Sequence, residues 1–418
     1  MNESKIKSRR NFLKTFSLIT GSTLLSSQMP WLRDLHAQEP GRRVRLGIIG
    51  SGSRGSYLQL HLKDIPECDM ICVCDNYPPN LEAGLAIAGK QAKGYTNHLE
   101  MLEKEQLDAV IIATPLHEHA HITLDALNAG VHVFCEKSMA RTIEDSDNMV
   151  KAQQKTGKIL LIGHQRMFNV KYQRALQMIN EGKIGPVTHM RAYWHRNSDW
   201  RRPVPSPGLE RKINWRLYKE YSCGILTELT SHQVQVTNQI LNEVPQYVYG
   251  SGTTNYWKDG REVEDNVSLV YKYPGGTHLV YDSVNSNKHY GLEEQIMGPK
   301  GTMELEGGKI WNEIPPPAPG ILQLINQIEH KVFDVIPIGG ASWVPETAVI
   351  DKGEYIWNEV LESDGSKMEM EAFVSMVREN RFVPELLRQG FYATIASLMG
   401  YEAIQKNQVI TWPTNLSL

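Results

Sequence analysis

Residues 44–55 decide the fold, and they read Val-Arg-Leu-Gly-Ile-Ile-Gly-Ser-Gly-Ser-Arg-Gly. The first half, 44–49, is a short apolar run that predicts a buried strand. The second half is a Gly-x-Gly-x-x-Gly motif formed by Gly50, Gly52 and Gly55, and a helix is expected to begin inside it. In this strand–turn–helix context the motif predicts dinucleotide binding.

Each glycine of the motif has a physical role. The first permits a tight turn, the second lets the backbone approach a pyrophosphate, and the third lets the helix pack closely on the strand. The phosphates would bind at the helix N-terminus, near Ser53 and Arg54. The Arg54 side chain could contact the pyrophosphate or only solvent, and the sequence leaves both open. The predicted cofactor site at 50–55 therefore includes Gly50, Gly52, Ser53, Arg54 and Gly55.

Asp75 ends the second apolar run, about 20 residues after the motif, where an acidic residue is expected in dinucleotide-binding folds. Its carboxylate is placed to accept hydrogen bonds from both hydroxyls of an adenosine ribose. A carboxylate would repel a 2′-phosphate, and no arginine follows in 75–78. The sequence therefore predicts NAD in preference to NADP.

The N-terminal half alternates short apolar runs with longer amphipathic ones. Because the runs show little polar alternation, they predict strands covered on both faces, as in a doubly wound parallel sheet. Helical stretches such as 118–128 and 143–154 separate them. The predicted Rossmann domain covers 38–165, and its strands are 44–49, 70–74, 109–113, 131–135 and 159–162.

The pattern changes after Gly163, where strands at hairpin spacing predict an α+β domain with a large, open, mostly antiparallel sheet over 166–418. Helices are expected at 171–180 and 226–241. Two closing helices, 367–379 and 384–405, are expected to pack back on the core, and 313–345 is a predicted flap or oligomer contact. The predicted strands are 187–193, 246–252, 267–273, 277–283, 294–297 and 302–305.

Composition narrows the class of protein. With 41% hydrophobic and 22% charged residues, the 418-residue chain resembles a soluble globular protein, and its net charge of -3 gives no field for nucleic-acid binding. The body of the chain has no apolar run of the ~20 residues that span a bilayer. We expect no metal site, because no Cys/His spacing suggests one, and we interpret Cys68, Cys72, Cys74, Cys135 and Cys223 as buried thiols.

The first 37 residues have the parts of a twin-arginine signal peptide. Arg9 and Arg10 precede a moderately apolar stretch, 15–25, and Leu35-His36-Ala37 offers a small-residue cleavage site. We therefore expect export of the folded protein to the periplasm. The alternative is a basic amphipathic arm that is retained.

Two further motifs carry a family resemblance. Residues 113–120 read Ala-Thr-Pro-Leu-His-Glu-His-Ala, and 135–138 read Cys-Glu-Lys-Ser, each at the end of a predicted strand. Together with the glycine motif they resemble the glucose–fructose oxidoreductase/inositol dehydrogenase (Gfo/Idh/MocA) family, from Val44 almost to the C-terminus. The resemblance implies a Rossmann domain beside an α/β domain whose open sheet mediates homo-dimers or homo-tetramers. It also implies oxidation or reduction of sugars and polyols.

The family's Glu-Lys-Pro motif is matched by Glu136 and Lys137, so the resemblance makes Lys137 the catalytic lysine and places both residues at the cofactor. An ammonium at the carboxyl end of a parallel strand can stabilise alkoxide character as a hydride leaves. Ser138 replaces the proline. In the family the peptide bond after this lysine is often cis. A cis bond before a non-proline residue costs ~3 kcal/mol, so the sequence does not decide whether the Lys137–Ser138 bond is cis or trans.

The resemblance also assigns residues after the third predicted strand. Thr114, Pro115 and His117 are expected to line the nicotinamide pocket. His119 is interpreted as a structural helix residue. Arg166 matches a basic position of the family and is expected near the substrate.

A second catalytic motif of the family, an aspartate followed four residues later by a histidine, is matched by Glu228 and His232. On a helix these two lie on one face, one turn apart. His232 would be the general base that takes the hydroxyl proton. Glu228 would orient the imidazole or bind a sugar hydroxyl itself. Without the resemblance, the pair would be an ordinary surface contact.

Aromatic and arginine side chains concentrate between the two catalytic motifs. Indoles can stack on the apolar face of a pyranose while guanidinium groups bind its hydroxyls, although the same residue types are enriched at subunit contacts. We predict substrate binding by His195, Trp200, Arg201, Trp215 and Arg216, with Arg202 among them.

Three functions follow from these residues. The first is hydride transfer between a sugar ring carbon, C3 being favoured, and tightly bound NAD. The second is NAD-dependent glycoside cleavage by transient oxidation and elimination, which needs an additional base such as Tyr193, His195 or Tyr221. The third is a non-catalytic sugar-binding protein of the same fold, which would not need to keep Lys137 and His232.

Overall fold

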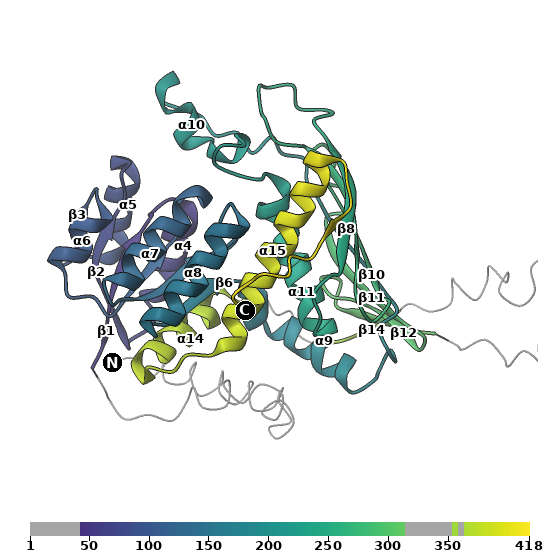
Figure 1. Cartoon of the computed structure of the whole chain (residues 1–418). Coiled ribbons are helices and arrows are strands. Elements are labelled where there is room, and N and C mark those ends of the chain that lie inside the picture. Colours follow the sequence, from purple (N-terminus) through teal and green to yellow (C-terminus); the bar gives the residue numbers. More distant parts are fainter. Residues whose placement is uncertain (1–41, 314–352, 358–362) are drawn as a thin grey trace, which may run out of the picture. The chain divides into compact units, whose positions relative to one another are not determined.

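The computed structural model describes residues 42–313, 353–357 and 363–418 (Figure 1). Its chain divides into two compact units. The described part of the first unit comprises 42–168, 364–391 and 416–418, and the second comprises the remainder. The predicted signal peptide and nearly all of the predicted flap lie outside the described residues.

The first unit is built on a six-stranded parallel sheet with the order β3-β2-β1-β4-β5-β6. This arrangement confirms the predicted Rossmann fold. The short strand β3 was not predicted, because none of its three residues is buried and it carries no apolar run. The strands are β1 Val44–Ile49, β2 Cys68–Cys74, β3 Lys93–Tyr95, β4 Ala109–Ile112, β5 His132–Glu136 and β6 Leu160–Gly163.

Helices connect these strands and cover the sheet. Strands β4, β5 and β6 are buried at every position, as continuous apolar runs require when both faces are covered. The helices of this unit are α4 Ser53–Leu62, α5 Pro78–Ala88, α6 His98–Lys104, α7 His119–Asn128, α8 Ile143–Thr156 and α14 Ser366–Glu379.

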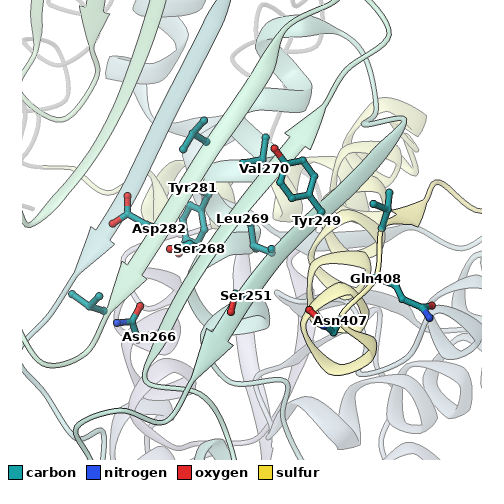
Figure 2. A pocket seen from close by; sticks show the side chains of 14 residues that line it. Tyr249, Ser251, Asn266, Ser268, Leu269, Val270, Tyr281, Asp282, Asn407 and Gln408 are labelled. Atoms are coloured by element: carbon teal, nitrogen blue, oxygen red, sulfur yellow. The ribbon is translucent and has the colours of Figure 1, made fainter.

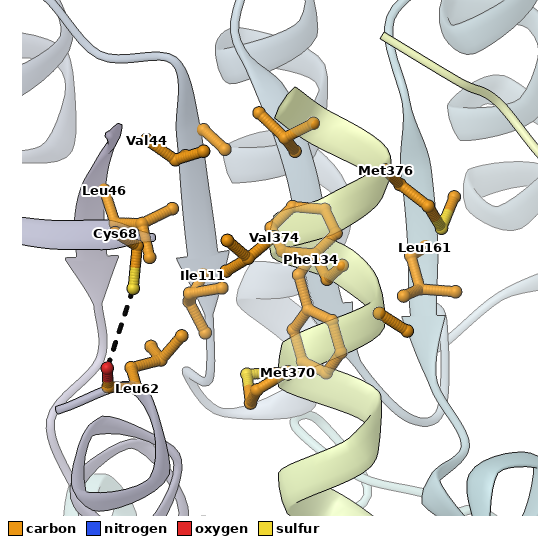
Figure 3. Packing of buried hydrophobic residues seen from close by; sticks show 14 of the residues in the cluster. Val44, Leu46, Leu62, Cys68, Ile111, Phe134, Leu161, Met370, Val374 and Met376 are labelled. Atoms are coloured by element: carbon orange, nitrogen blue, oxygen red, sulfur yellow. Dashed lines mark hydrogen bonds between the residues drawn. The ribbon is translucent and has the colours of Figure 1, made fainter. Parts of the chain in front are cut away.

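The helix α14 comes from the C-terminal end of the chain and completes the core of the first unit (Figure 3). Met370, Phe373 and Val374 on α14 are buried with apolar residues of β1, β4, β5 and β6. The rings of Phe134 and Phe373 meet edge to face with centroids 5.7 Å apart. The prediction that a closing helix packs back on the core is thus confirmed.

The second unit is built on a nine-stranded sheet with the order β14-β13-β12-β11-β7-β10-β9-β8-β15. Its described strand pairs are antiparallel except β7 with β10, which confirms the predicted mostly antiparallel sheet. The strands are β7 His189–His195, β8 Tyr247–Thr253, β9 Asn266–Lys272, β10 His278–Val284, β11 Leu292–Gly298, β12 Gly301–Glu304, β13 Lys309–Asn312, β14 Glu354–Tyr355 and β15 Ile410–Thr411.

Helices cover one face of this sheet, and no described helix covers the other, which is called the open face. On β9 and β10, buried residues alternate with more exposed ones, as expected when one face packs on a core. Tyr271 on the covered face is fully buried and donates a hydrogen bond to the Ala396 carbonyl, 3.2 Å away. The helices of this unit are α9 Val170–Asn180, α10 Glu210–Ile213, α11 Ser231–Leu241 and the second part of α15 Pro384–Lys406.

The predicted helix over 226–241 is not uniform. It begins with a π-helical turn, Leu226–Thr230, and continues as α11. The Thr230 hydroxyl donates to the Ile225 carbonyl at 3.4 Å, five residues back, as the wider turn allows. This turn carries Glu228, and α11 carries His232.

The cysteines confirm the sequence interpretation, because all five are buried and none forms a disulfide. Burial raises the pKa of Cys68, Cys72 and Cys74 to about 12, so these thiols stay protonated. Among the described helices, none is both long and apolar enough to traverse a bilayer.

Candidate active site

The three glycines of the motif are required for different reasons. The fold itself requires Gly50 and Gly55, whereas Gly52 is explained by a ligand. Gly50 has φ +88°, and a Cβ there would lie 2.7 Å from the Ala113 backbone. A Cβ on Gly55 would lie 2.0 Å from the Gly50 carbonyl oxygen. A Cβ on Gly52 would meet nothing closer than the Asn80 side chain at 3.7 Å. Room is thus left over the start of α4, where a pyrophosphate would approach.

The start of α4 fits an anion. Its N-cap, Gly52, supplies no side-chain hydrogen bond, and its first turn, which begins at Ser53, has no acidic residue. The backbone N–H groups there are therefore available to phosphate oxygens. The Asp75 carboxylate accepts one hydrogen bond from the Ser51 N–H and one from the Tyr77 N–H, each at 2.8 Å. Each oxygen can still accept another bond from a ribose hydroxyl.

Arg54 is held by carboxylates, a role that the sequence did not predict. Its Nε donates to Glu136 Oε1 at 2.6 Å, and its Nη1 donates to the Ser366 hydroxyl at 3.0 Å. Glu369 lies 3.9 Å from Nη2 and is fully buried, and burial raises the pKa of its carboxyl group. Arg54 therefore ties the glycine-loop helix to the end of β5 and to α14.

The ends of β5 and β6 bring Lys137 and Arg166 together. Glu136 and Gly163 are partners in the sheet, so Lys137 and His164 follow side by side. Burial lowers the pKa of His164 to about 3, and the charges of Lys137 and Arg166 act in the same direction. The Lys137–Ser138 peptide bond is cis, which settles the geometry left open by the missing proline.

The loop after β4 carries Thr114, Pro115 and His117. His119, at the start of α7, is buried and connects this loop to the one after β5. Its Nδ1 lies 2.9 Å from the Ser138 carbonyl oxygen, and its Nε2 lies 3.0 Å from that of Thr114. The structural role predicted for His119 is confirmed.

In the second unit, Glu228 accepts a hydrogen bond from Arg216 Nε at 2.6 Å. The Arg216 guanidinium lies over the indole of Trp215, 4.2 Å from the ring centroid. His232 is buried on α11, and its ring lies 5.6 Å from that of Trp194. Glu228, Arg216 and Trp215 therefore form one stacked, charge-paired group, as the sequence prediction of a shared site requires.

The structure does not bring His195, also predicted to bind substrate, together with these residues. Successive residues of a strand point to opposite faces, so His195 lies on the open face of β7 while Trp194 lies on the face toward His232. The imidazole hydrogen-bonds Asp282 on β10 and contacts the rings of Tyr193 and Tyr290.

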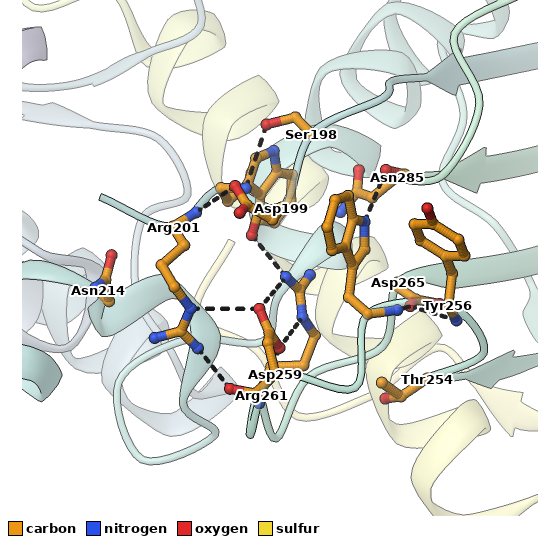
Figure 4. A network of polar contacts seen from close by, with 12 residues as sticks. Ser198, Asp199, Arg201, Asn214, Thr254, Tyr256, Asp259, Arg261, Asp265 and Asn285 are labelled. Carbon is orange, nitrogen blue, oxygen red and sulfur yellow. Dashed lines mark hydrogen bonds and ion pairs between the residues drawn. The ribbon is translucent and has the colours of Figure 1, made fainter. Parts of the chain in front are cut away.

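The guanidinium of Arg201, also predicted to bind substrate, is used within the fold (Figure 4). It donates to the Glu210 carboxylate, to Asp259 Oδ2 at 3.3 Å and to the Asp259 carbonyl at 3.0 Å. A fork satisfied by protein acceptors has little capacity left for sugar hydroxyls. Trp200, beside it, has φ +59°, and its N–H donates to the Ser198 hydroxyl at 3.2 Å.

The sequence analysis did not identify two residues of the group around Glu228 and His232, namely Trp194 and Arg196. The Arg196 guanidinium lies 4.6 Å from the centroid of the Trp194 ring. The alternation of side chains along a strand could have identified both. Met190, Ala192 and Trp194 are two residues apart and point to the same apolar face of β7, and Arg196 continues this series. The sequence analysis chose His195, one residue away on the other face.

A pocket lies on the open face of the sheet rather than beside His232 (Figure 2). Val270, Val280 and Tyr249 contribute apolar surface, and Asp282 contributes a carboxylate. The last turn of α15 and the residues after it form one side, through Asn407 and Gln408. Across the described ranges, no three His, Cys, Asp or Glu side chains gather to hold a metal ion.

Comparison with known proteins gives the family. Residues 44–164 match the model described as "Oxidoreductase family, NAD-binding Rossmann fold", and 172–304 match the GFO/IDH/MocA C-terminal domain. A glycosyl hydrolase family 109 protein of Stenotrophomonas maltophilia is 34% identical over 202 residues, 45% of this chain and 42% of that protein. The chain thus matches less than half the length of that relative.

Two inositol dehydrogenases extend the likeness. The inositol 2-dehydrogenase of Salmonella typhimurium is 27% identical over 63% of this chain and 74% of its own. The scyllo-inositol dehydrogenase of Lactobacillus casei, solved with NAD(H) and scyllo-inositol, has a TM-score of 0.66 at 19% identity, covering 89% of this chain and all of that one. With both domain models matched in order, the chain belongs to the GFO/IDH/MocA family of oxidoreductases, and its cofactor is NAD.

Proposed function

We propose that the protein transfers a hydride between a ring carbon of a sugar or glycoside, most favourably C3, and tightly bound NAD. The observation that carries the proposal is Lys137, which directly follows β5 at the carboxyl edge of the NAD-binding sheet. Ligands of such folds bind at this edge, where the strand order reverses between β1 and β4. An ammonium at this position suits an alcohol that is becoming a carbonyl.

NAD bound at this edge would supply the hydride acceptor for oxidation of the carbon. Lys137 donates a hydrogen bond to the reacting oxygen and stabilises the negative charge that builds there. His232 takes the hydroxyl proton through its imidazole, the side chain most often used as a general base. Reduction of a ketosugar follows the same steps in reverse.

Burial supports the role of His232. Its side chain is nearly inaccessible to solvent and lies against the Trp194 indole. An imidazole held in this way keeps one orientation and transfers protons without competition from bulk water. The indole offers a flat apolar surface of the kind that binds the C–H face of a sugar ring.

Glycoside cleavage is a second candidate, favoured by the 34% identity to a glycosyl hydrolase family 109 protein. A ketone at C3 acidifies the C2–H bond, so loss of that proton and of the anomeric substituent can follow. Addition of water and return of the hydride then complete a net hydrolysis. Of the three bases considered for the C2 proton, Tyr193 and His195 lie on the open sheet face, which leaves Tyr221.

The test begins with the nucleotide that copurifies with the protein. Denaturation should release NAD or NADH, and glycosides added to native protein should change the absorbance near 340 nm. The variant Lys137→Met should keep the nucleotide but lose turnover by about 10²–10⁴-fold, because the lysine acts on the reacting oxygen. The exposed Lys104→Met is the matched control.

The product separates the two candidates. Release of a ketosugar supports the oxidoreductase, whereas release of a free sugar without added NAD supports glycoside cleavage. Retained turnover in Lys137→Met, or a protein that binds NAD and changes no sugar, would refute the proposal.

Two further properties belong to this proposal. We propose a homo-oligomer that associates through the open sheet face, where Tyr249 is 47% exposed and borders the pocket described above. We also propose export to the periplasm on the basis of Arg9, Arg10 and the stretch that follows. Tight retention of NAD would then be required, since the exported enzyme could not draw on the cytoplasmic pool.

A further inference from the structure

Three arginines and one carboxylate meet in the second unit near His232. Arg196 follows β7, Arg202 lies in the loop beyond it, and Arg216 lies in a short 3-10 turn. The Coulombic influence of Arg216 and Glu228 reaches both Arg196 and Arg202. Three positive charges therefore face a single negative one, and that one is already hydrogen-bonded to Arg216.

Arg196 has an aromatic neighbour but no counter-ion of its own. Its guanidinium stacks on the Trp194 indole at 4.6 Å and forms no ion pair with another described residue. Burial lowers the pKa of Arg196, and Arg216 lowers it further against the opposing effect of Glu228. A half-buried guanidinium without a carboxylate loses hydration that nothing in the described chain replaces.

Arg202 is held by its backbone alone. Its N–H donates to Asn214 Oδ1 at 2.7 Å, and its carbonyl accepts from Asn214 Nδ2 at 3.0 Å. These two bonds fix the main chain and leave the guanidinium for another partner. Arg202 is an exposed residue whose side chain is partly desolvated, and this desolvation lowers its pKa, with the charge of Arg216 acting in the same direction.

Nearby arginines show what a structural arginine looks like in this fold. Arg201 is bound by Glu210 and Asp259, and Arg261 donates to both oxygens of Asp259 at 2.9 and 2.8 Å (Figure 4). The chain thus supplies carboxylates where a guanidinium holds the loops together. Within the described residues no carboxylate pairs with Arg196 or Arg202, so both guanidinium groups are left for another partner.

We propose that Arg196 and Arg202, with Arg216 behind them, bind an anionic group of the substrate, so that the protein acts on an acidic sugar. A guanidinium fork fits the two oxygens of a carboxylate or of a phosphate, and two forks hold such a group in a fixed direction. With its acidic group fixed and its ring against Trp194, a sugar has a defined orientation toward His232. The inference rests on the proposed function, whose substrate class it narrows.

The experiment uses the purified full-length protein with its bound nucleotide and three variants. Arg196→Gln and Arg202→Gln each remove one fork while keeping polarity and approximate size. Arg191→Gln is the matched control, because Arg191 is on the same strand but points to the open face, over Tyr193. Melting temperature and nucleotide content are measured for each variant to identify misfolding.

The probes are glucuronate, glucose 6-phosphate and glucose, at constant ionic strength. Calorimetry gives each dissociation constant without turnover, and reduction of the bound NAD gives kcat and KM. At least one acidic probe should bind more tightly than glucose. Arg196→Gln and Arg202→Gln should each weaken its binding about 10–100-fold, mainly through KM, because each loses a charge-assisted hydrogen bond. Binding of glucose should change less than about threefold, and Arg191→Gln should behave as wild type.

Comparison of the two acidic probes identifies the anion as a carboxylate or a phosphate. The inference is overturned if neither acidic probe binds better than glucose, or if folded arginine variants weaken acidic and neutral probes equally. Failure of the proposed function is a different result, namely that no sugar changes the oxidation state of the bound NAD while the acidic probe still binds in the calorimeter.

Discussion

Gly52 and Gly55 lack side chains for different reasons. At Gly55 the fold itself forbids a Cβ, which would lie 2.0 Å from the Gly50 carbonyl oxygen. At Gly52 the fold has room, with the nearest atom at 3.7 Å, so only a ligand explains the residue. The glycine motif therefore contains both a folding requirement and a binding requirement, and they can be separated by mutation.

Gly52→Ala is expected to lower NAD affinity by about tenfold or more, because a methyl group would occupy the path of the pyrophosphate to the start of α4. Its melting temperature should stay close to that of the wild type. Gly55→Ala is the contrasting variant and should lose about 1–3 kcal/mol or more of stability through overpacking. Thermal unfolding and nucleotide content measure the two effects, and a stable Gly52→Ala that keeps its NAD would contradict the assignment.

For single residues, the sequence predicted those that belong to a recognisable local motif. It missed those whose role depends on which face of a strand the side chain points to, or on a contact far away in the sequence. Asp75 and Lys137 each follow an apolar run and belong to a recognisable motif, so a local stretch of sequence was enough to place them. His195 was chosen for its chemistry, but the strand register turns it to the open face. The contact of Arg54 with Ser366 joins residues 312 positions apart, and no local pattern reports such a pair.

His132, the first residue of β5, is hydrogen-bonded in its neutral form to Ile159, the residue before β6. His132 Nδ1 accepts a hydrogen bond from the Ile159 N–H at 2.9 Å, so a proton on that nitrogen would remove the acceptor. Burial lowers the pKa of His132 to about 4, and the charge of Lys158 acts in the same direction. The pairing of these elements is therefore sensitive to acid.

The free energy of unfolding is expected to fall as the pH drops from about 6.5 toward 4. In this range His132 binds a proton in the unfolded chain but stays neutral in the folded chain. From the pKa difference, this residue contributes up to ~3 kcal/mol of stability that is fully present above pH 6.5. His132→Asn should flatten this part of the curve, because its amide oxygen can still accept from Ile159 and does not titrate. Urea unfolding at several pH values is the measurement, and equal slopes for both proteins would contradict the prediction.

Element boundaries were predictable where apolar periodicity is strong and not where hydroxyls compete with the backbone. The strands that carry apolar patterns were predicted with nearly correct ranges, whereas the short strands β3, β13, β14 and β15 were not predicted. The π-helical turn at Leu226–Thr230 was expected to be regular helix. Hydroxyl groups such as those of Thr230 and Ser231 hydrogen-bond preceding carbonyls in this segment, and periodicity does not register that competition.

For the whole molecule, the open sheet face gives a prediction of assembly. Val280 lies in its pocket on β10, so Val280→Glu should place a charge within the proposed interface and dissociate the oligomer. Leu60→Glu, at an exposed position of α4, is the control. Light scattering should give a multiple of the chain mass for wild type and control and a single chain for Val280→Glu. If the wild-type protein has the mass of a single chain, the proposed interface does not exist.

Export gives a second prediction at this scale. Replacement of Arg9 and Arg10 by lysine should block passage by the twin-arginine route while leaving the enzyme folded, because that route recognises the arginine pair. Fractionation should then find the protein, with its NAD, in the cytoplasm. Undiminished periplasmic protein would disprove the assignment and favour a retained basic arm.

The helix α14 has a consequence for synthesis. When 42–168 have left the ribosome, all six strands of the first unit exist, but Phe134 and its neighbours still lack the helix that carries Phe373. Nearly 200 further residues must be translated before that cover arrives. The nascent chain therefore exposes apolar surface until α14 has been synthesised, and a chaperone can bind that surface during this time.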